Sequence, residues 1–151
     1  MAVTFSLDNE VFRVYLAYAG LVAFKMLILS PLISTTRVSK RIYENPEDSE
    51  LNSPEPNKYV RKDPWIERMR RCHLNDLENI VPFLIVGLLY VLTGPSVDAA
   101  TWHFRIFVVS RCIHTIAYLL PLPQPTRFLM MYVGWFTTAS MAVQCLKIGQ
   151  F

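Results

Sequence analysis

The sequence has few of the residues and patterns that mark several common protein classes. Its three cysteines, Cys72, Cys112 and Cys145, form neither an even-numbered disulfide framework nor a cluster with metal-ligand spacing. We therefore expect reduced thiols and no metal ion. No basic block with interleaved aromatic residues occurs, which argues against a nucleic-acid partner. The N-terminal sequence lacks a basic segment and a small-residue cleavage site, so we expect no removable signal peptide.

Charge is absent from two long segments, 79–97 and 128–146. Two further apolar segments carry isolated charges: Lys25 lies in the middle of 11–34, and two arginines lie within 99–120. The chain is 52% hydrophobic with a mean hydropathy of +0.28, which is too apolar for an ordinary soluble domain of 151 residues. A membrane helix needs roughly 20 mostly apolar residues. The four segments therefore predict an all-α integral membrane protein.

We expect one domain over residues 1–151, built as a four-transmembrane-helix bundle. The predicted spans are approximately 9–36, 64–95, 98–120 and 126–147. Basic residues follow the first apolar segment at Arg37, Lys40 and Arg41, whereas Asp8 and Glu10 precede it together with Arg13. By the positive-inside rule, the connecting loop 37–63 is then cytosolic and both termini are lumenal.

Local signals predict where two of the helices begin. Asp8 or Asn9 can cap the first helix. Asp63 followed by Pro64 is a start signal for the second helix, which we expect to end at Leu92. The polar, proline-containing sequence between these helices has no periodicity and is predicted to be a flexible loop.

The second predicted helix opens with a dense block of ionisable and amide side chains, ERMRRCHLNDLEN, that leads straight into apolar sequence. At helical spacing Arg71, Asn75 and Glu78 fall on one face. Arg70 and His73 lie on a neighbouring stripe. Such residues are costly to keep at a membrane boundary unless they have a function.

The third predicted helix has a second polar stripe, formed by Arg111, His114 and Tyr118 at i, i+3 and i+7. Under the proposed topology both stripes point toward the cytosolic side, where Arg37 and Arg127 end the neighbouring helices. Arginine forks bind carboxylates bidentately. A ligand with two carboxylates and one amine would fit this set.

Glu78 is the one acceptor placed for the ammonium of such a ligand. The alternative is that these buried polar residues only pair with one another and hold the helices together. Asp76 is expected to pair with a nearby base in this way. Lys25 either extends to the membrane interface or faces other helices.

Several sequence runs carry a resemblance to a known family. They are ERMRRCHLNDLEN, HTIAYLLPLPQP, NPED and Pro82-Phe83, together with Arg37 and Arg111. On these runs the chain resembles the MAPEG family of membrane proteins in eicosanoid and glutathione metabolism. The resemblance covers about residues 8–147, and it is greatest to the microsomal glutathione transferase branch.

The resemblance implies a four-helix protomer in a homotrimer, with glutathione bound in clefts between subunits that open to the cytosol. The implied glutathione contacts are Arg37, Arg70, Arg71, His73, Asn75, Glu78, Arg111, His114 and Tyr118. Arg127 matches the catalytic arginine of the family, which steadies the glutathione thiolate. A free thiol is mostly protonated at neutral pH, and an adjacent guanidinium favours the nucleophilic anion.

Two positions depart from relatives within the family. Phe128 follows the catalytic arginine where the prostaglandin E synthase branch has a serine. Ser49 occupies a position where some glutathione transferases carry a reactive cysteine. We therefore expect neither prostaglandin synthesis nor activation through a thiol at that position.

The predicted function is a membrane-bound glutathione transferase that conjugates glutathione to hydrophobic electrophiles and also reduces lipid hydroperoxides. Glutathione is the co-substrate, and the expected partners are the electrophile, membrane lipid and two further copies of the chain. The expected location is the endoplasmic reticulum membrane, with the outer mitochondrial membrane as a second possibility and the active site facing the cytosol. The alternatives are a specialised eicosanoid enzyme resembling leukotriene C4 synthase and a non-catalytic lipid-binding member of the family.

Overall fold

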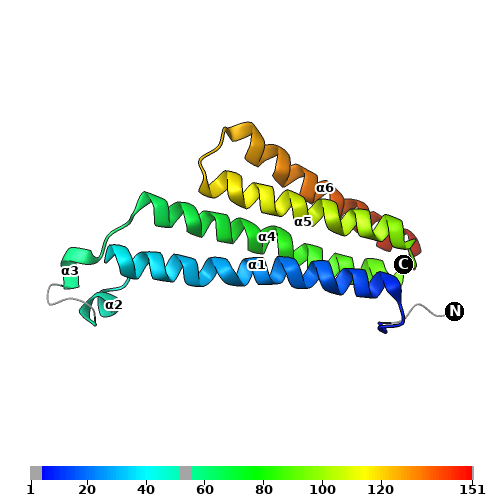
Figure 1. Ribbon diagram of the computed structural model, residues 1–151, viewed down its shortest axis with the longest axis horizontal. Coiled ribbons are helices and arrows are strands. Elements are labelled where there is room, and N and C mark those ends of the chain that lie inside the picture. The colour runs from blue at the N-terminus through cyan, green and yellow to red at the C-terminus, as the bar shows by residue number, and fades with distance from the viewer. Residues whose placement is uncertain (1–4, 52–55, 151) are drawn as a thin grey trace.

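The computed structural model describes residues 5–51 and 56–150, which are largely helical. The helices are α1 (Glu10–Lys40), α2 (Pro46–Glu50), α3 (Pro56–Tyr59), α4 (Pro64–Leu92), α5 (Val97–Leu119) and α6 (Gln124–Ile148). The four long helices run along the length of the molecule, whereas α2 and α3 lie together at one end (Figure 1). α1 begins and α6 ends at the opposite end (Figure 1).

Capping side chains mark the starts of the first two long helices. The Asn9 side chain accepts backbone hydrogen bonds in the first turn of α1. The Asp63 side chain does the same at α4, where Pro64 is the first helical residue. The start signals at Asn9 and at Asp63-Pro64 are thus confirmed, and α4 ends at Leu92 as expected.

The segment predicted as a loop, 37–63, differs from that expectation. α1 continues through Lys40, since no glycine or proline interrupts its last two turns, and Arg41 ends it with a left-handed φ of 50°. The helices α2 and α3 then form within sequence that was predicted to be flexible, and a proline such as Pro46 opens each of them. Arg37 consequently projects from a helix rather than from a loop.

In the part of the chain that the structure describes, three helices are long and apolar enough to cross a membrane, namely α1, α4 and α6. Their length and composition indicate a multi-pass membrane protein. α5 is not among them, although it has 23 residues. Arg105, Arg111 and two histidines lower its hydropathy.

Two apolar clusters hold the long helices together. The larger cluster contains Phe83 and Phe107, whose rings stack with centroids 3.8 Å apart. The smaller cluster lies toward α2 and α3 and comprises Leu29, Ile33, Ile42, Ile66, Met69 and Cys72. Between the clusters, α1, α4 and α5 contribute a set of interacting polar side chains that we call the polar layer: Lys25, Asn75, Asp76, Arg111 and His114.

Candidate functional site

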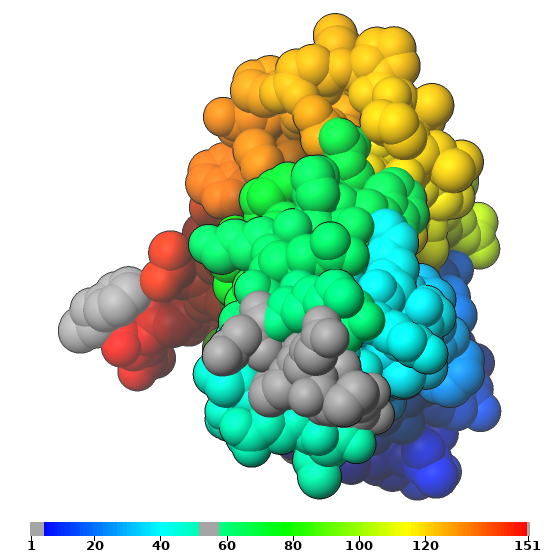
Figure 2. Space-filling model, turned by 90° about the vertical axis from the view of Figure 1, so that its left-hand side faces the viewer, coloured from blue at the N-terminus to red at the C-terminus, as the bar shows by residue number. Residues whose placement is uncertain are grey.

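The predicted site residues come mostly from the helix ends nearest α2 and α3. At this end of the molecule α1 terminates, α4 begins, and α5 connects to α6 (Figure 1). Figure 2 views this end directly, with the start of α4 between the end of α1 and the connection of α5 to α6. Three separate segments of the sequence, the end of α1, the start of α4 and the α5–α6 connection, therefore lie at the same end of the molecule (Figure 1).

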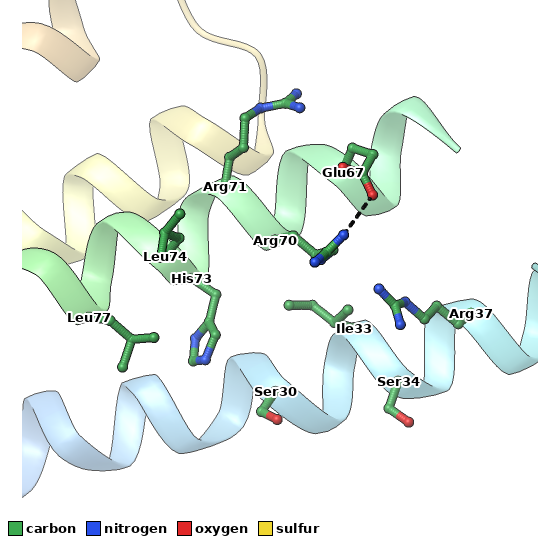
Figure 3. A pocket seen from close by; sticks show the side chains of 10 residues that line it. All are labelled: Ser30, Ile33, Ser34, Arg37, Glu67, Arg70, Arg71, His73, Leu74 and Leu77. Atoms are coloured by element: carbon green, nitrogen blue, oxygen red, sulfur yellow. Dashed lines mark hydrogen bonds and ion pairs between the residues drawn. The ribbon is translucent and has the colours of Figure 1, made fainter. Parts of the chain in front are cut away.

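A cleft between α1 and α4, the α1–α4 cleft, brings together four of the predicted residues. They are Arg37, Arg70, Arg71 and His73, and Ser30, Ile33, Ser34, Glu67, Leu74 and Leu77 complete the lining. In Figure 3 Arg37 on α1 and Arg70 on α4 point toward each other, whereas Arg71 points away from α1. The cleft has a volume of about 560 Å³, which suits a small-molecule ligand.

Two carboxylates that the sequence interpretation did not assign hold the arginines of this cleft. Glu44 Oε1 accepts hydrogen bonds from Arg37 Nη2 at 2.5 Å and from Arg70 Nη1 at 2.6 Å. Glu67 Oε1 lies 3.2 Å from the same Arg70 nitrogen. Glu67 stood in the polar block of α4 and could have been found by its i, i+3 spacing to Arg70. Glu44 lies outside the long helices, so no periodicity pointed to it.

Asn75, Arg111 and His114 meet in the polar layer, deeper in the molecule than the cleft. Arg111 Nη2 donates to Asn75 Oδ1 at 2.6 Å and to Asp76 Oδ1 at 3.0 Å. Lys25 Nζ donates to Asp76 Oδ2 at 2.6 Å. The prediction that Asp76 pairs with a base is confirmed, and Lys25 faces another helix rather than extending to the interface.

Tyr118 and Arg127 form a third group. The Arg127 guanidinium carbon lies 4.9 Å from the centroid of the Tyr118 ring, which is a cation–π contact between α5 and α6. The ring of His114 lies 5.6 Å from that of Tyr118 and connects this group to the polar layer. Arg127 Nη2 also donates to Gln124 Oε1 at 2.5 Å.

Glu78 is separated from the other predicted residues within one chain. It lines a smaller groove between α4 and α6 with Asn79, Pro82, Trp135, Thr138, Ala139 and Ala142. Helical spacing placed Glu78 on one face with Arg71 and Asn75, but three neighbouring helices pack against α4 and separate these side chains. The ten predicted residues are therefore distributed over a cleft, a polar layer, the Tyr118–Arg127 group and this groove.

Buried nitrogen atoms without a partner concentrate on the predicted residues. In the described part of the chain, the buried side-chain nitrogens and oxygens that lack a hydrogen bond are His73 Nδ1, Arg111 Nε, Arg111 Nη1 and Arg127 Nε. A buried polar group without a partner is costly and needs an explanation. The three arginine atoms are N–H donors, so the missing partner has acceptor groups.

The fold and these side chains together define a helical membrane protein with a cationic cleft and unsatisfied donors toward one end. The MAPEG family model matches residues 15–147, and the chain belongs to the MAPEG family. The family predicted from the sequence motifs is thereby confirmed.

Individual relatives include two kinds of enzyme by name. Microsomal glutathione S-transferase 1 of Homo sapiens is 48% identical over 143 residues, which cover 93% of this chain and 92% of that protein. The Mus musculus protein of the same name is 49% identical with the same coverage. Prostaglandin E synthase of Homo sapiens is 39% identical over 132 residues, covering 87% of this chain and 86% of that protein.

Proposed function

We propose that this chain is a membrane-bound glutathione transferase that joins the glutathione thiolate to hydrophobic electrophiles. The observation that carries the proposal is the set of buried, unpartnered nitrogens on His73, Arg111 and Arg127. Glutathione has two carboxylates, peptide carbonyls and a thiol that can ionise, so it supplies the acceptors these groups lack. The high identity to proteins named microsomal glutathione S-transferase 1 supports the same conclusion.

Within this proposal each group of residues has its own part. The arginines of the α1–α4 cleft and of the polar layer bind the two carboxylates, because guanidinium forks match carboxylate geometry. Glu78 accepts the ligand ammonium. Arg127 favours the ionised thiol by placing a positive charge beside it, and the thiolate then attacks the electrophile.

The assembly that we propose is a homotrimer in which α1, α4, α5 and α6 all cross the membrane. α5 packs against α1, α4 and α6, which supports a fourth span despite its arginines. Association of several copies would also give Glu78 and the cleft residues a route to a shared ligand, since they lie apart in one chain.

We place the protein in the endoplasmic reticulum membrane, with the outer mitochondrial membrane as a second location. The basic residues after α1 support a cytosolic position for the end that carries α2 and α3. Electrophiles dissolved in the lipid would then meet cytosolic glutathione at the membrane boundary. Lipid hydroperoxides are a second substrate class that a glutathione thiolate can reduce.

The test is an assay of detergent-purified protein with glutathione and a chromogenic aryl halide. Arg127→Ala should lower kcat at least about tenfold, since a neighbouring opposite charge shifts a pKa by one unit or more. Glutathione affinity should change much less. Arg13→Ala is the matched control, because Arg13 is exposed in the first turn of α1 at the opposite end. Normal turnover by Arg127→Ala would remove the role assigned to Arg127.

A second candidate is a specialised eicosanoid enzyme, and the similarity to prostaglandin E synthase supports this alternative. A substrate panel separates the two functions. Broad use of halogenated aromatics supports the transferase, whereas narrow use of one lipid epoxide or peroxide supports the specialist. Lipid binding with no consumption of glutathione would instead indicate a non-catalytic member of the family.

A further inference from the structure

The polar layer contains three charged side chains from three different helices. Asp76 bonds both Lys25 and Arg111, through its two different oxygens. Asp76 and Arg111 have 0% of their side-chain surface exposed, and Lys25 has 17%. Buried ions are tolerated when they are paired and hydrogen-bonded. Two cations against one carboxylate leave one positive charge uncompensated.

Asp76 holds the Arg111 guanidinium in one orientation. The Nη2 nitrogen is engaged by Asp76, by Asn75 and by His114 Nδ1, which lies 3.3 Å away. The Nε and Nη1 nitrogens have no partner. One edge of the fork is thus anchored by protein groups, and the remaining N–H donors are left for an anion.

We propose that Asp76 is a positioning residue of the glutathione site and that Lys25 sets the charge of this site, both through Arg111. This inference rests on the proposed function. Asp76 orients the Arg111 guanidinium and offsets part of its positive charge. Lys25, on α1, offsets the negative charge of Asp76 in turn, although it forms no hydrogen bond with Arg111 itself.

The two residues have opposite charges, so their removal should act on the ligand with opposite sign. Asp76→Asn makes the layer more positive and stabilises a nearby thiolate, whereas Lys25→Met makes the layer less positive and destabilises it. At an effective dielectric constant of about 20, a unit charge roughly 10 Å away shifts the ionisation equilibrium of the thiol about tenfold to twentyfold. Asp76→Asn leaves two buried cations without their carboxylate and should lower the stability of the fold, whereas Lys25→Met leaves Asp76 paired with Arg111.

The experiment compares wild type, Lys25→Met, Asp76→Asn and the double variant as detergent-purified full chains. Calorimetry gives the Kd for glutathione, and ultraviolet absorbance of the bound thiolate, followed against pH at saturating glutathione, gives the pKa of the bound thiol. Glu10→Gln, in the first turn of α1 at the opposite end of the molecule, is the control that should change neither quantity.

We expect the pKa of the bound thiol to fall in Asp76→Asn and to rise in Lys25→Met. In the double variant, whose net charge equals that of wild type, this pKa should return close to the wild-type value. The Kd should rise at least about tenfold in both variants that lack the Asp76 carboxylate, because Arg111 is no longer oriented by a charged hydrogen bond. The double variant should not regain wild-type affinity.

A purely structural role would move both measurements together and would not depend on the sign of the lost charge. Shifts of the thiol pKa in the same direction in the two single variants would therefore overturn the inference, as would wild-type affinity in the double variant. If Asp76→Asn does not fold, Lys25→Met and the double variant still test the inference. Lys25→Met must raise the pKa of the bound thiol, and the double variant must return this pKa to the wild-type value while binding glutathione weakly. A wild-type chain that binds no glutathione refutes the proposed function, and this inference with it.

Discussion

Glu44 forms hydrogen bonds with both of the arginines that face each other across the α1–α4 cleft. It bonds Arg37 and Arg70 through a single oxygen, and 34% of its side chain remains exposed. A ligand carboxylate that takes the same guanidinium nitrogens would have to displace Glu44. Glu44 would then compete with such a ligand for the cleft.

Replacing Glu44 should strengthen the binding of glutathione. Partly exposed ion pairs are worth roughly 0–1 kcal/mol each, so Glu44→Gln should lower the Kd about twofold to tenfold. Isothermal calorimetry on detergent-purified protein measures this. Glu47→Gln is the control, because Glu47 is an exposed residue of α2 that lines no part of the cleft. Weaker binding by Glu44→Gln would mean that Glu44 helps the ligand rather than competing with it.

Asp63 should give α4 a stability that depends on pH. The Ile66 N–H and then the Lys40 ammonium hold the pKa of the Asp63 carboxyl below its ordinary value of 3.8. A group whose pKa is lowered by folding stabilises the fold above its unfolded pKa, and the contribution is lost as the pH falls through the folded value. Asp63→Asn keeps a capping side chain without the charge. Its Tm should lie below that of wild type at neutral pH, and the difference should begin to shrink near pH 3.8 and vanish as the pH falls through the lowered pKa of the folded state. A constant difference would contradict this cause.

Helical spacing identified which side chains of α4 share a stripe, but not what each stripe faces. Arg70 and His73 lie in the α1–α4 cleft, whereas Asn75 and Asp76 meet Arg111 on α5. Which neighbour a helix face packs against depends on how the helix is rotated relative to the surrounding helices. A single sequence does not directly indicate this rotation. The pairing of Asp76 was predictable because a buried carboxylate needs a base.

At the scale of the helices, boundaries were predictable where capping chemistry was strong. Asp63-Pro64 marked the start of α4, and its end at Leu92 followed from the Gly-Pro pair just beyond. The end of α1 was not predicted correctly, because Arg41 adopts a left-handed conformation that is uncommon for arginine and that the sequence does not indicate. The short helices α2 and α3 were missed because four or five residues are too few to show a period.

The approach of α1 to α4 depends on Gly87. A Cβ built on Gly87 would lie 3.0 Å from Tyr15 Cε2. Tyr15 cannot easily move, because it is buried, its hydroxyl donates to the Leu84 carbonyl at 2.7 Å, and its ring packs edge-on against Phe104. The contact is therefore one that a methyl group would strain.

Gly87→Ala should destabilise the protein by about 1–3 kcal/mol through overpacking, in spite of the better helix propensity of alanine. Thermal unfolding in detergent, followed by circular dichroism, should show a lower Tm. Gly20→Ala in α1 is the matched control, since no atom lies within 4 Å of its added Cβ, and its Tm should stay level or rise. A Tm at or above wild type for Gly87→Ala would show that Tyr15 adjusts freely.

At the scale of the whole molecule, composition predicted a helical membrane protein, and the motifs predicted its family correctly. The number of subunits could not be derived from the residues, because lipid-facing and subunit-facing apolar surfaces have the same composition. α6 shows the difficulty: Phe128, Leu129, Trp135 and Phe136 are all more than half exposed in the single chain. Either lipid or another copy could cover them.

If glutathione binds between subunits, separated chains should lose it. Native mass spectrometry of the detergent-extracted protein should report three copies, and a detergent that yields single chains should abolish glutathione binding. The reason is that Glu78 and the α1–α4 cleft are separate features of one chain. Single chains that retain the affinity of the assembly would place the whole site within one protomer.

The polar layer also has a mechanical consequence for helices surrounded by lipid. Apolar side chains gain little by choosing one helix neighbour over the lipid tails, so apolar contacts alone would let α1 slide along α4 by a turn at small cost. Such a slide, about 5.4 Å, would carry Lys25 out of reach of Asp76 and leave its ammonium without a partner among hydrocarbon. The Lys25–Asp76 contact therefore helps to fix the position of α1 along α4, together with the hydrogen bond from Tyr15 to the Leu84 carbonyl. The contacts across the α1–α4 cleft depend on this alignment.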